Sequence, residues 1–123
     1  MKEILLYVAS GMTGLWGVSH LFATTGVVKG FGVITTDNKR IITMEWIVEG
    51  VAFLSIAALV AVVTAIEPNA SVSMAVYAVA IGTLIVLAIV SFFTGFKIAF
   101  LPFRLCPFIL AISAILIALG ISL

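Results

Sequence analysis

The segment NKRIITMEWIVEGVAFLSIAAL, residues 38–59, decides the fold of this 123-residue chain, because it has the length and apolarity of a membrane-spanning helix. Crossing the hydrocarbon core of a bilayer takes about 20 helical residues. Two carboxylates, Glu45 and Glu49, nevertheless lie inside the run, four residues apart. Insertion of a charged side chain into a bilayer is unfavourable by several kcal/mol. Carboxylates kept in such a helix therefore need polar partners or a cavity.

The composition extends the membrane assignment to the whole chain. Hydrophobic residues make up 64% of the sequence and charged residues 9%, whereas a soluble domain is about half apolar and about one quarter charged. These values predict one integral membrane domain over residues 1–123. The formal net charge of +1 offers no electrostatic basis for binding nucleic acid. The single cysteine, Cys106, excludes an internal disulfide.

Four apolar segments are long enough to cross a bilayer. They cover residues of about 4–26, 41–66, 72–96 and 105–123. Lipid offers backbone groups no hydrogen-bond partner, so each spanning segment must be helical or belong to a closed barrel. The segments lack the alternation of polar and apolar residues typical of barrel strands. The sequence therefore predicts an all-α fold, a bundle of four transmembrane helices. We expect the first segment to be retained, because no small-residue signal-peptide cleavage site ends it.

The basic residues predict the orientation of the bundle. Five of the six lie in or beside the two connections that follow the first and third segments, namely Lys29, Lys39, Arg40, Lys97 and Arg104. Basic residues in short loops mark the cytoplasmic face of a membrane. We therefore expect a multi-pass protein with both termini on the outer, periplasmic side.

Polar side chains within the predicted helices gather in one layer near the basic connections. A spacing of four puts Glu45 and Glu49 on one helix face, and two neighbouring carboxylates in a low-dielectric layer favour sharing a proton. The only histidine, His20, lies at the same depth on the preceding antiparallel segment. With Trp16 and Trp46 beside them, these residues form the predicted ligand-binding or proton-handling site.

This polar layer admits three interpretations: ion pairs that hold the bundle together, a metal site, or a ligand cavity. Lys97 and Arg104 end the third segment and precede the fourth, so they can supply supporting ion pairs that lock the bundle. His20, Glu45 and Glu49 are of the residue types that bind metals, but they lack a motif spacing, and we expect no metal site. The third interpretation is a cavity that holds a ligand. The sequence leaves the cofactor undetermined.

Two stretches carry a resemblance to a known group of proteins. They are GLWGVSHLF at residues 14–22 and GFGVITTDNKRIITMEWIVEG at residues 30–50, with VVKGFG at residues 27–32 joining them. Followed by further spans, they resemble the DoxX-like group of small bacterial four-helix membrane proteins. The resemblance implies a bacterial inner-membrane location and, for some members, a link to quinol oxidation or sulfur redox metabolism. This chain departs from the group in lacking an arginine in the first helix and in carrying Glu45 and Glu49.

These patterns favour a binding or accessory protein over an enzyme. We expect an intramembrane His/Glu site near the cytoplasmic side that holds an amphiphilic, lipid-like or quinone-like ligand, in a homodimer or a larger membrane complex. One alternative is a small proton-coupled or cation-coupled transporter. The other is an intramembrane isomerase, in which the carboxylates and His20 would act as acid and base.

Overall fold

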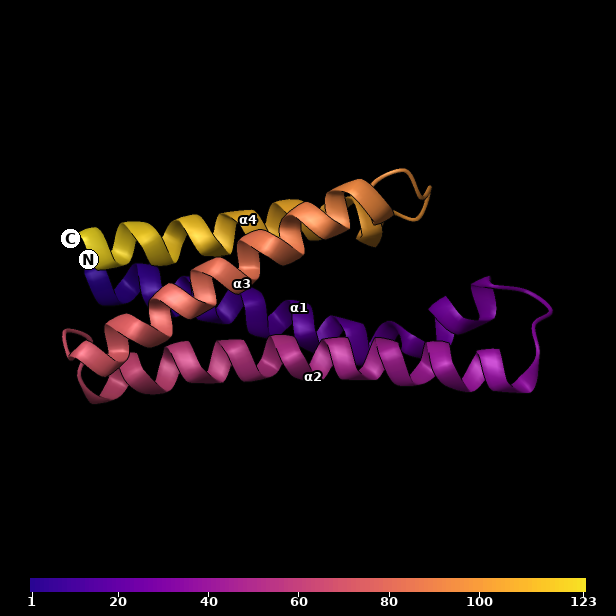
Figure 1. Ribbon diagram of the computed structural model, residues 1–123, viewed down its shortest axis with the longest axis horizontal. Coiled ribbons are helices and arrows are strands. Elements are labelled where there is room, and N and C mark those ends of the chain that lie inside the picture. Colours follow the sequence, from indigo (N-terminus) through magenta and orange to yellow (C-terminus); the bar gives the residue numbers. More distant parts are fainter.

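The computed structural model describes all 123 residues as four helices joined by short connections (Figure 1). The helices are α1 (Lys2–Gly30), α2 (Thr36–Ile66), α3 (Ser71–Gly95) and α4 (Leu101–Ser122). Each is long and apolar enough to cross a membrane. The predicted all-α bundle of four such helices is confirmed, and the side of the membrane that holds the termini stays a prediction.

Three helices extend further than predicted towards the basic connections. α1 continues past residue 26 to Gly30, α2 begins at Thr36 instead of residue 41, and α4 begins at Leu101 instead of residue 105. These additional turns are more polar than the spans, so hydropathy does not mark them. The side chain of Thr35 caps α2 by accepting a hydrogen bond from the backbone N–H of Asn38 at 3.2 Å.

The four helices form a ring in which the backbones of diagonally opposite helices stay apart. α1 packs against α2 and α4, α3 packs against α4, and the contact between α2 and α3 is the smallest. Figure 1 shows why, because α3 starts beside α2 and ends beside α4. α2 and α3 thus diverge towards the end that holds the α1–α2 and α3–α4 connections. We call this the basic-loop end, after Lys29, Lys39, Arg40, Lys97 and Arg104.

Two glycines set the distance between α1 and α2. A β-carbon built on Gly17 would lie 2.7 Å from the carbonyl oxygen of Gly50, and one built on Gly50 would lie 3.0 Å from that of Gly17. Small residues at such a crossing let two membrane helices approach closely. Further along the same interface the Ser10 hydroxyl donates a hydrogen bond to the carbonyl of Ala57 at 2.8 Å.

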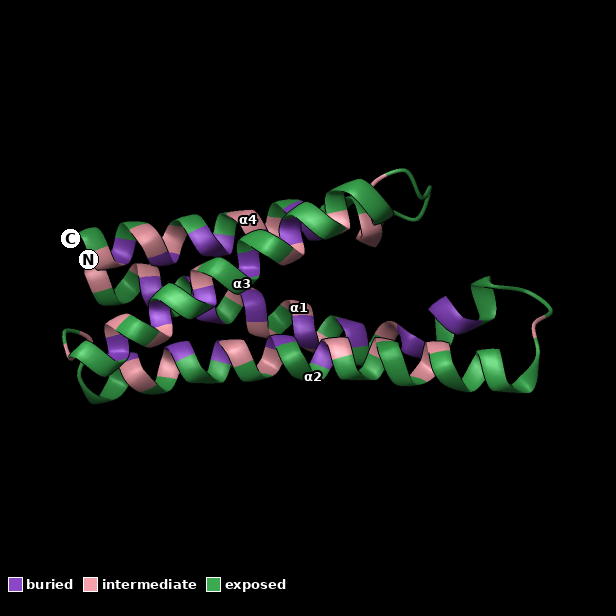
Figure 2. Ribbon diagram, viewed as in Figure 1, coloured by how far each residue is buried: buried purple, intermediate pink, exposed green.

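The packed core occupies the half of the bundle nearer the termini. Buried positions lie on the inward faces of all four helices, and exposed positions cover the outward faces (Figure 2). The largest fully buried side chains include Leu6, Phe53, Tyr77, Leu84 and Leu110. The Tyr77 hydroxyl is hydrogen-bonded to that of Thr64 at 2.9 Å, so the core polar groups of α2 and α3 satisfy each other. The outward faces are largely apolar, as lipid contact requires.

Gly17→Ala should lower the unfolding free energy by about 1–3 kcal/mol, the usual effect of overpacking a close contact. The added methyl group would meet the α2 backbone, which cannot move without separating the helices. Gly11→Ala is the matched control on the same helix, because nothing lies within 4 Å of its β-carbon. Reversible unfolding in mixed micelles with increasing dodecyl sulfate measures both variants. Equal stabilities for the two would contradict the close crossing.

Candidate functional site

A cavity of about 550 Å³ opens at the basic-loop end, where α2 and α3 diverge. Its volume falls within the range of small-molecule sites, roughly 300–1,000 Å³. All four helices contribute to its lining. The aromatic and ionisable lining residues are Trp16, His20, Trp46, Glu49, Phe103 and Cys106. The hydroxyl-bearing lining residues are Ser19, Ser91 and Thr94.

His20 lies at the centre of an aromatic cluster. Its side chain is buried, and its ring stacks on that of Trp46 with centroids 4.7 Å apart and planes 26° apart. The rings of Trp16 and Phe53 meet it edge-on at 5.4 Å and 5.2 Å. His20 follows Gly17 by three residues on α1, so the close crossing brings its ring against α2. These three rings hold the imidazole in place, and its Nε2 atom faces Glu49.

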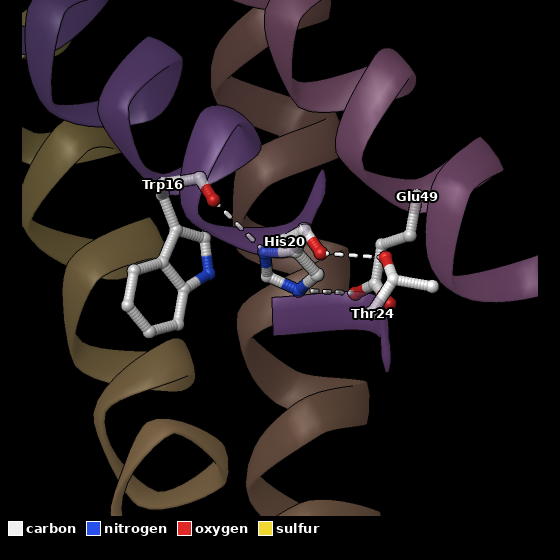
Figure 3. A network of polar contacts seen from close by, with 4 residues as sticks. All are labelled: Trp16, His20, Thr24 and Glu49. Carbon is white, nitrogen blue, oxygen red and sulfur yellow. Dashed lines mark hydrogen bonds and ion pairs between the residues drawn. The ribbon is translucent and has the colours of Figure 1, made fainter. Parts of the chain in front are cut away.

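The hydrogen bond made by Nδ1 defines the tautomer of His20. Nδ1 lies 2.9 Å from the carbonyl oxygen of Trp16, one turn earlier on α1 (Figure 3). A carbonyl oxygen only accepts, so Nδ1 carries a proton and donates it. The carbonyl of His20 itself accepts from the Thr24 hydroxyl at 2.8 Å, which holds the next turn. Nε2 is therefore the nitrogen that gains or loses the second proton.

Nε2 faces the carboxylate of Glu49. The distance between Nε2 and Oε1 is 3.7 Å, which suits an ion pair and is longer than a hydrogen bond (Figure 3). A single proton can lie on either side, giving imidazolium with carboxylate or imidazole with carboxylic acid. The pair is electrically neutral in both forms, as a low-dielectric layer favours. The Glu49 side chain is 43% exposed and lines the cavity, so it can meet a ligand while it faces His20.

The hydroxyl groups in the cavity lining donate their hydrogen bonds to backbone carbonyls of their own helices. Ser19, Ser91 and Thr94 each donate to a carbonyl three or four residues earlier on their own helix, at 2.8, 3.1 and 2.7 Å. Their oxygen atoms therefore offer only acceptor lone pairs to the cavity. The indole nitrogens of Trp16 and Trp46 are buried donors without a partner. Because these indole nitrogens are covered by protein atoms, the hydroxyl oxygens and the Glu49 carboxylate make the accessible polar surface of the cavity rich in acceptors.

Glu45 does not share this cavity. The prediction placed Glu45 and Glu49 together, but Glu45 is exposed and absent from the lining. The inward stripe of α2 runs through Trp46, Glu49 and Phe53, with spacings of three and four. Glu45 precedes Trp46 by one residue and is therefore rotated about 100° away from it.

The predicted supporting ion pairs are also absent. Lys97 lies in the α3–α4 connection with an exposed side chain, and Arg104 lies on the outer side of α4. The Nε atom of Arg104 donates to the carbonyl of Ile98 at 3.1 Å and thus closes the connection. Neither cation forms an ion pair with a carboxylate in the structure. No group of three His, Cys, Asp or Glu side chains converges as metal ligands would.

Two aromatic residues of the site were missing from the sequence prediction. Phe53 on α2 meets His20, and Phe103 on α4 lies 5.4 Å from Trp46 between ring centroids. The sequence does contain an indication for Phe53, because its spacing from Trp46 and Glu49 puts all three side chains on one helix face. Phe103 precedes Cys106 by three residues and shares its helix face. It lies before residue 105, where the apolar span begins, so hydropathy does not place it on a helix.

No family model, curated protein or solved structure matches the chain.

The tautomer can be measured directly, because His20 is the only histidine in the chain. Nitrogen-15 NMR of labelled protein should show Nδ1 protonated throughout a pH titration, since the Trp16 carbonyl needs a donor. A neutral imidazole with its proton on Nε2 would contradict the assigned geometry.

Proposed function

We propose that this chain is a multi-pass membrane protein that binds a small amphiphile, lipid-like or quinone-like, with the head group against Glu49 and His20. The observation that carries the proposal is one ionisable pair enclosed by aromatic side chains in a cavity made by all four helices. A pair that served only to hold helices together would not need an adjoining cavity. Ligand sites are typically apolar cavities with a few placed polar groups.

The seam between α2 and α3 offers a place for the apolar tail. A second, almost wholly apolar groove of about 280 Å³ lies on the same seam, nearer the termini. Ile56 and Leu59 line it from α2, and Val76, Val79 and Thr83 line it from α3. Thr83 is one turn before Leu87, which lines the main cavity. A tail that leaves the cavity between the diverging helices would therefore meet this groove within the hydrocarbon layer.

The distribution of packing favours binding over the two alternatives. Transport needs access from both sides, whereas the half of the bundle nearer the termini is filled by buried side chains such as Leu6 and Tyr77. An isomerase needs an acid and a base on either side of its substrate, whereas Glu49 and His20 face each other. An accessory role in a homodimer or larger complex is compatible with ligand binding and belongs to the same proposal.

The cellular setting follows from the charge distribution and the resemblance. Five basic residues at the basic-loop end favour a cytoplasmic location for that end. The DoxX-like resemblance favours a bacterial inner membrane. The cavity would then open in the cytoplasmic half of the bilayer.

Ligand binding should stabilise the protein against unfolding. We expect some members of a panel of single-tailed amphiphiles with different head groups to raise the unfolding free energy by about 2.7 kcal/mol when the ligand is present at 100 times its Kd. Glu49→Gln should weaken this stabilisation, because Glu49 lines the cavity. Glu45→Gln is the matched control, one turn away and outside the lining. Equal stabilisation of wild type and both variants would remove Glu49 from the ligand site.

The orientation can be tested with fusions to the C-terminus in bacteria. Alkaline phosphatase becomes active only outside the cytoplasm, and green fluorescent protein becomes fluorescent mainly inside it. We expect an active phosphatase fusion and a dark fluorescent fusion, because the basic connections should stay in the cytoplasm. The reverse pattern would place the cavity in the outer half of the membrane.

A further inference from the structure

The cavity lining contains a carboxylate but no lysine or arginine. Glu49 is the only carboxylate in the lining, and His20 is the only lining side chain that can carry a positive charge. No lysine or arginine lines the cavity, since Lys97 and Arg104 are exposed outside it. A phosphate or carboxylate head would therefore enter beside Glu49 without a fixed cation to offset its charge. Such a ligand is strongly disfavoured in a low-dielectric site.

The hydrogen-bonding groups of the lining also favour a cationic head group. Ser91 and Thr94 from α3 and Ser19 from α1 present acceptor oxygens, because their protons are engaged by their own helices. The carboxylate of Glu49 adds two more acceptor oxygens. The remaining donors, the indole N–H groups of Trp16 and Trp46, have nitrogens covered by protein atoms. A head group that donates several hydrogen bonds and carries positive charge complements this surface.

We propose that the amphiphile carries a protonated amine as its head, and that this ammonium replaces the proton shared by His20 and Glu49. The inference rests on the proposed amphiphile site and specifies its ligand class. Ammonium has three donors and no acceptor, which suits the acceptor-rich lining. The aromatic rings of Trp46 and Phe103 in the same lining favour a cation further.

Charge neutrality requires the exchange. Before binding, the pair holds one proton and has no net charge. If the ammonium entered while that proton stayed, the site would hold one uncompensated positive charge, which is costly in a low-dielectric environment. If the proton leaves Nε2 or Glu49 for bulk water, the ammonium pairs with the Glu49 carboxylate and the site is neutral again. His20 then keeps only its Nδ1 proton, which the Trp16 carbonyl accepts.

Few other groups can take part in this exchange. From α1 the lining contains only His20 as a titratable group, from α2 only Glu49, and from α4 only the Cys106 thiol. α3 contributes no titratable side chain to the lining. Glu45 is exposed outside it. One ligand should therefore release one proton.

The head-group preference is tested with a matched set of probes: a primary alkylamine, an alcohol and a carboxylic acid of equal chain length, each with a terminal bromine. The protein has two tryptophans, and both line the cavity, so quenching of their fluorescence reports on this site. In nanodiscs of phosphatidylcholine we expect saturable quenching by the amine, at least about tenfold weaker binding of the alcohol, and no saturable quenching by the carboxylate. Glu49→Gln should reduce amine affinity to the level of the alcohol, whereas Glu45→Gln should not change it.

The proton exchange is tested in the wild-type protein, which avoids dependence on any variant. While the pair holds its proton, amine affinity should rise about tenfold per pH unit, the slope for release of one proton, and then reach a plateau. A pH-indicator dye in weak buffer should record one proton released per bound amine on the rising part. A flat profile without proton release would overturn the exchange.

The outcomes separate the inference from the function on which it rests. Equal quenching by amine, alcohol and carboxylate, unchanged in Glu49→Gln, would overturn the amine preference and leave amphiphile binding in place. Absence of saturable quenching by every probe, together with no stabilisation by the wider panel, would overturn the amphiphile site itself.

Discussion

The close crossing of α1 and α2 at Gly17 and Gly50 sets the positions of His20 and Glu49 and so the geometry of the cavity beside them. Either β-carbon would lie within 3.0 Å of a backbone atom of the opposite helix. His20 follows one glycine by three residues, and Glu49 directly precedes the other. The imidazole and the carboxylate are therefore brought together by backbone contact, without a flexible loop. The remaining space opens because α3 leaves α2 to follow α4.

The pair explains how a carboxylate is tolerated deep in an apolar helix. Glu49 faces an imidazole whose other nitrogen is fixed as a donor by the Trp16 carbonyl, so one proton carried by either Nε2 or the carboxylate keeps the site neutral. Aromatic rings enclose His20, and the rest of Glu49 meets the cavity. An ionisable pair that is half open to a cavity can exchange its proton for another cation. This property connects the structural role of the pair with the proposed binding function.

Hydropathy was sufficient to predict the four helices, because lipid leaves a long apolar segment no alternative to a helix. The common depth of His20 and Glu49 followed from the antiparallel order of the first two helices. The rotation of α2 could not be predicted, because a spacing of four permits either carboxylate of the pair to face inward. Packing of Gly50, Phe53 and Ala57 decides this rotation and leaves Glu45 exposed. The partner of Arg104 could not be predicted either. Its hydrogen bond to the carbonyl of Ile98 depends on the conformation of the α3–α4 connection, which hydropathy does not describe.

A double-mutant cycle measures whether His20 and Glu49 interact with each other. The variants His20→Phe, Glu49→Met and the double variant replace the pair by apolar groups of similar size, and reversible unfolding measures each. Either single change should leave an unpaired polar group. The double change should then be less destabilising than the sum of the single changes, by about 0.5–3 kcal/mol. Strictly additive effects would show that the two side chains do not interact and would rule out the pair as the basis of the site.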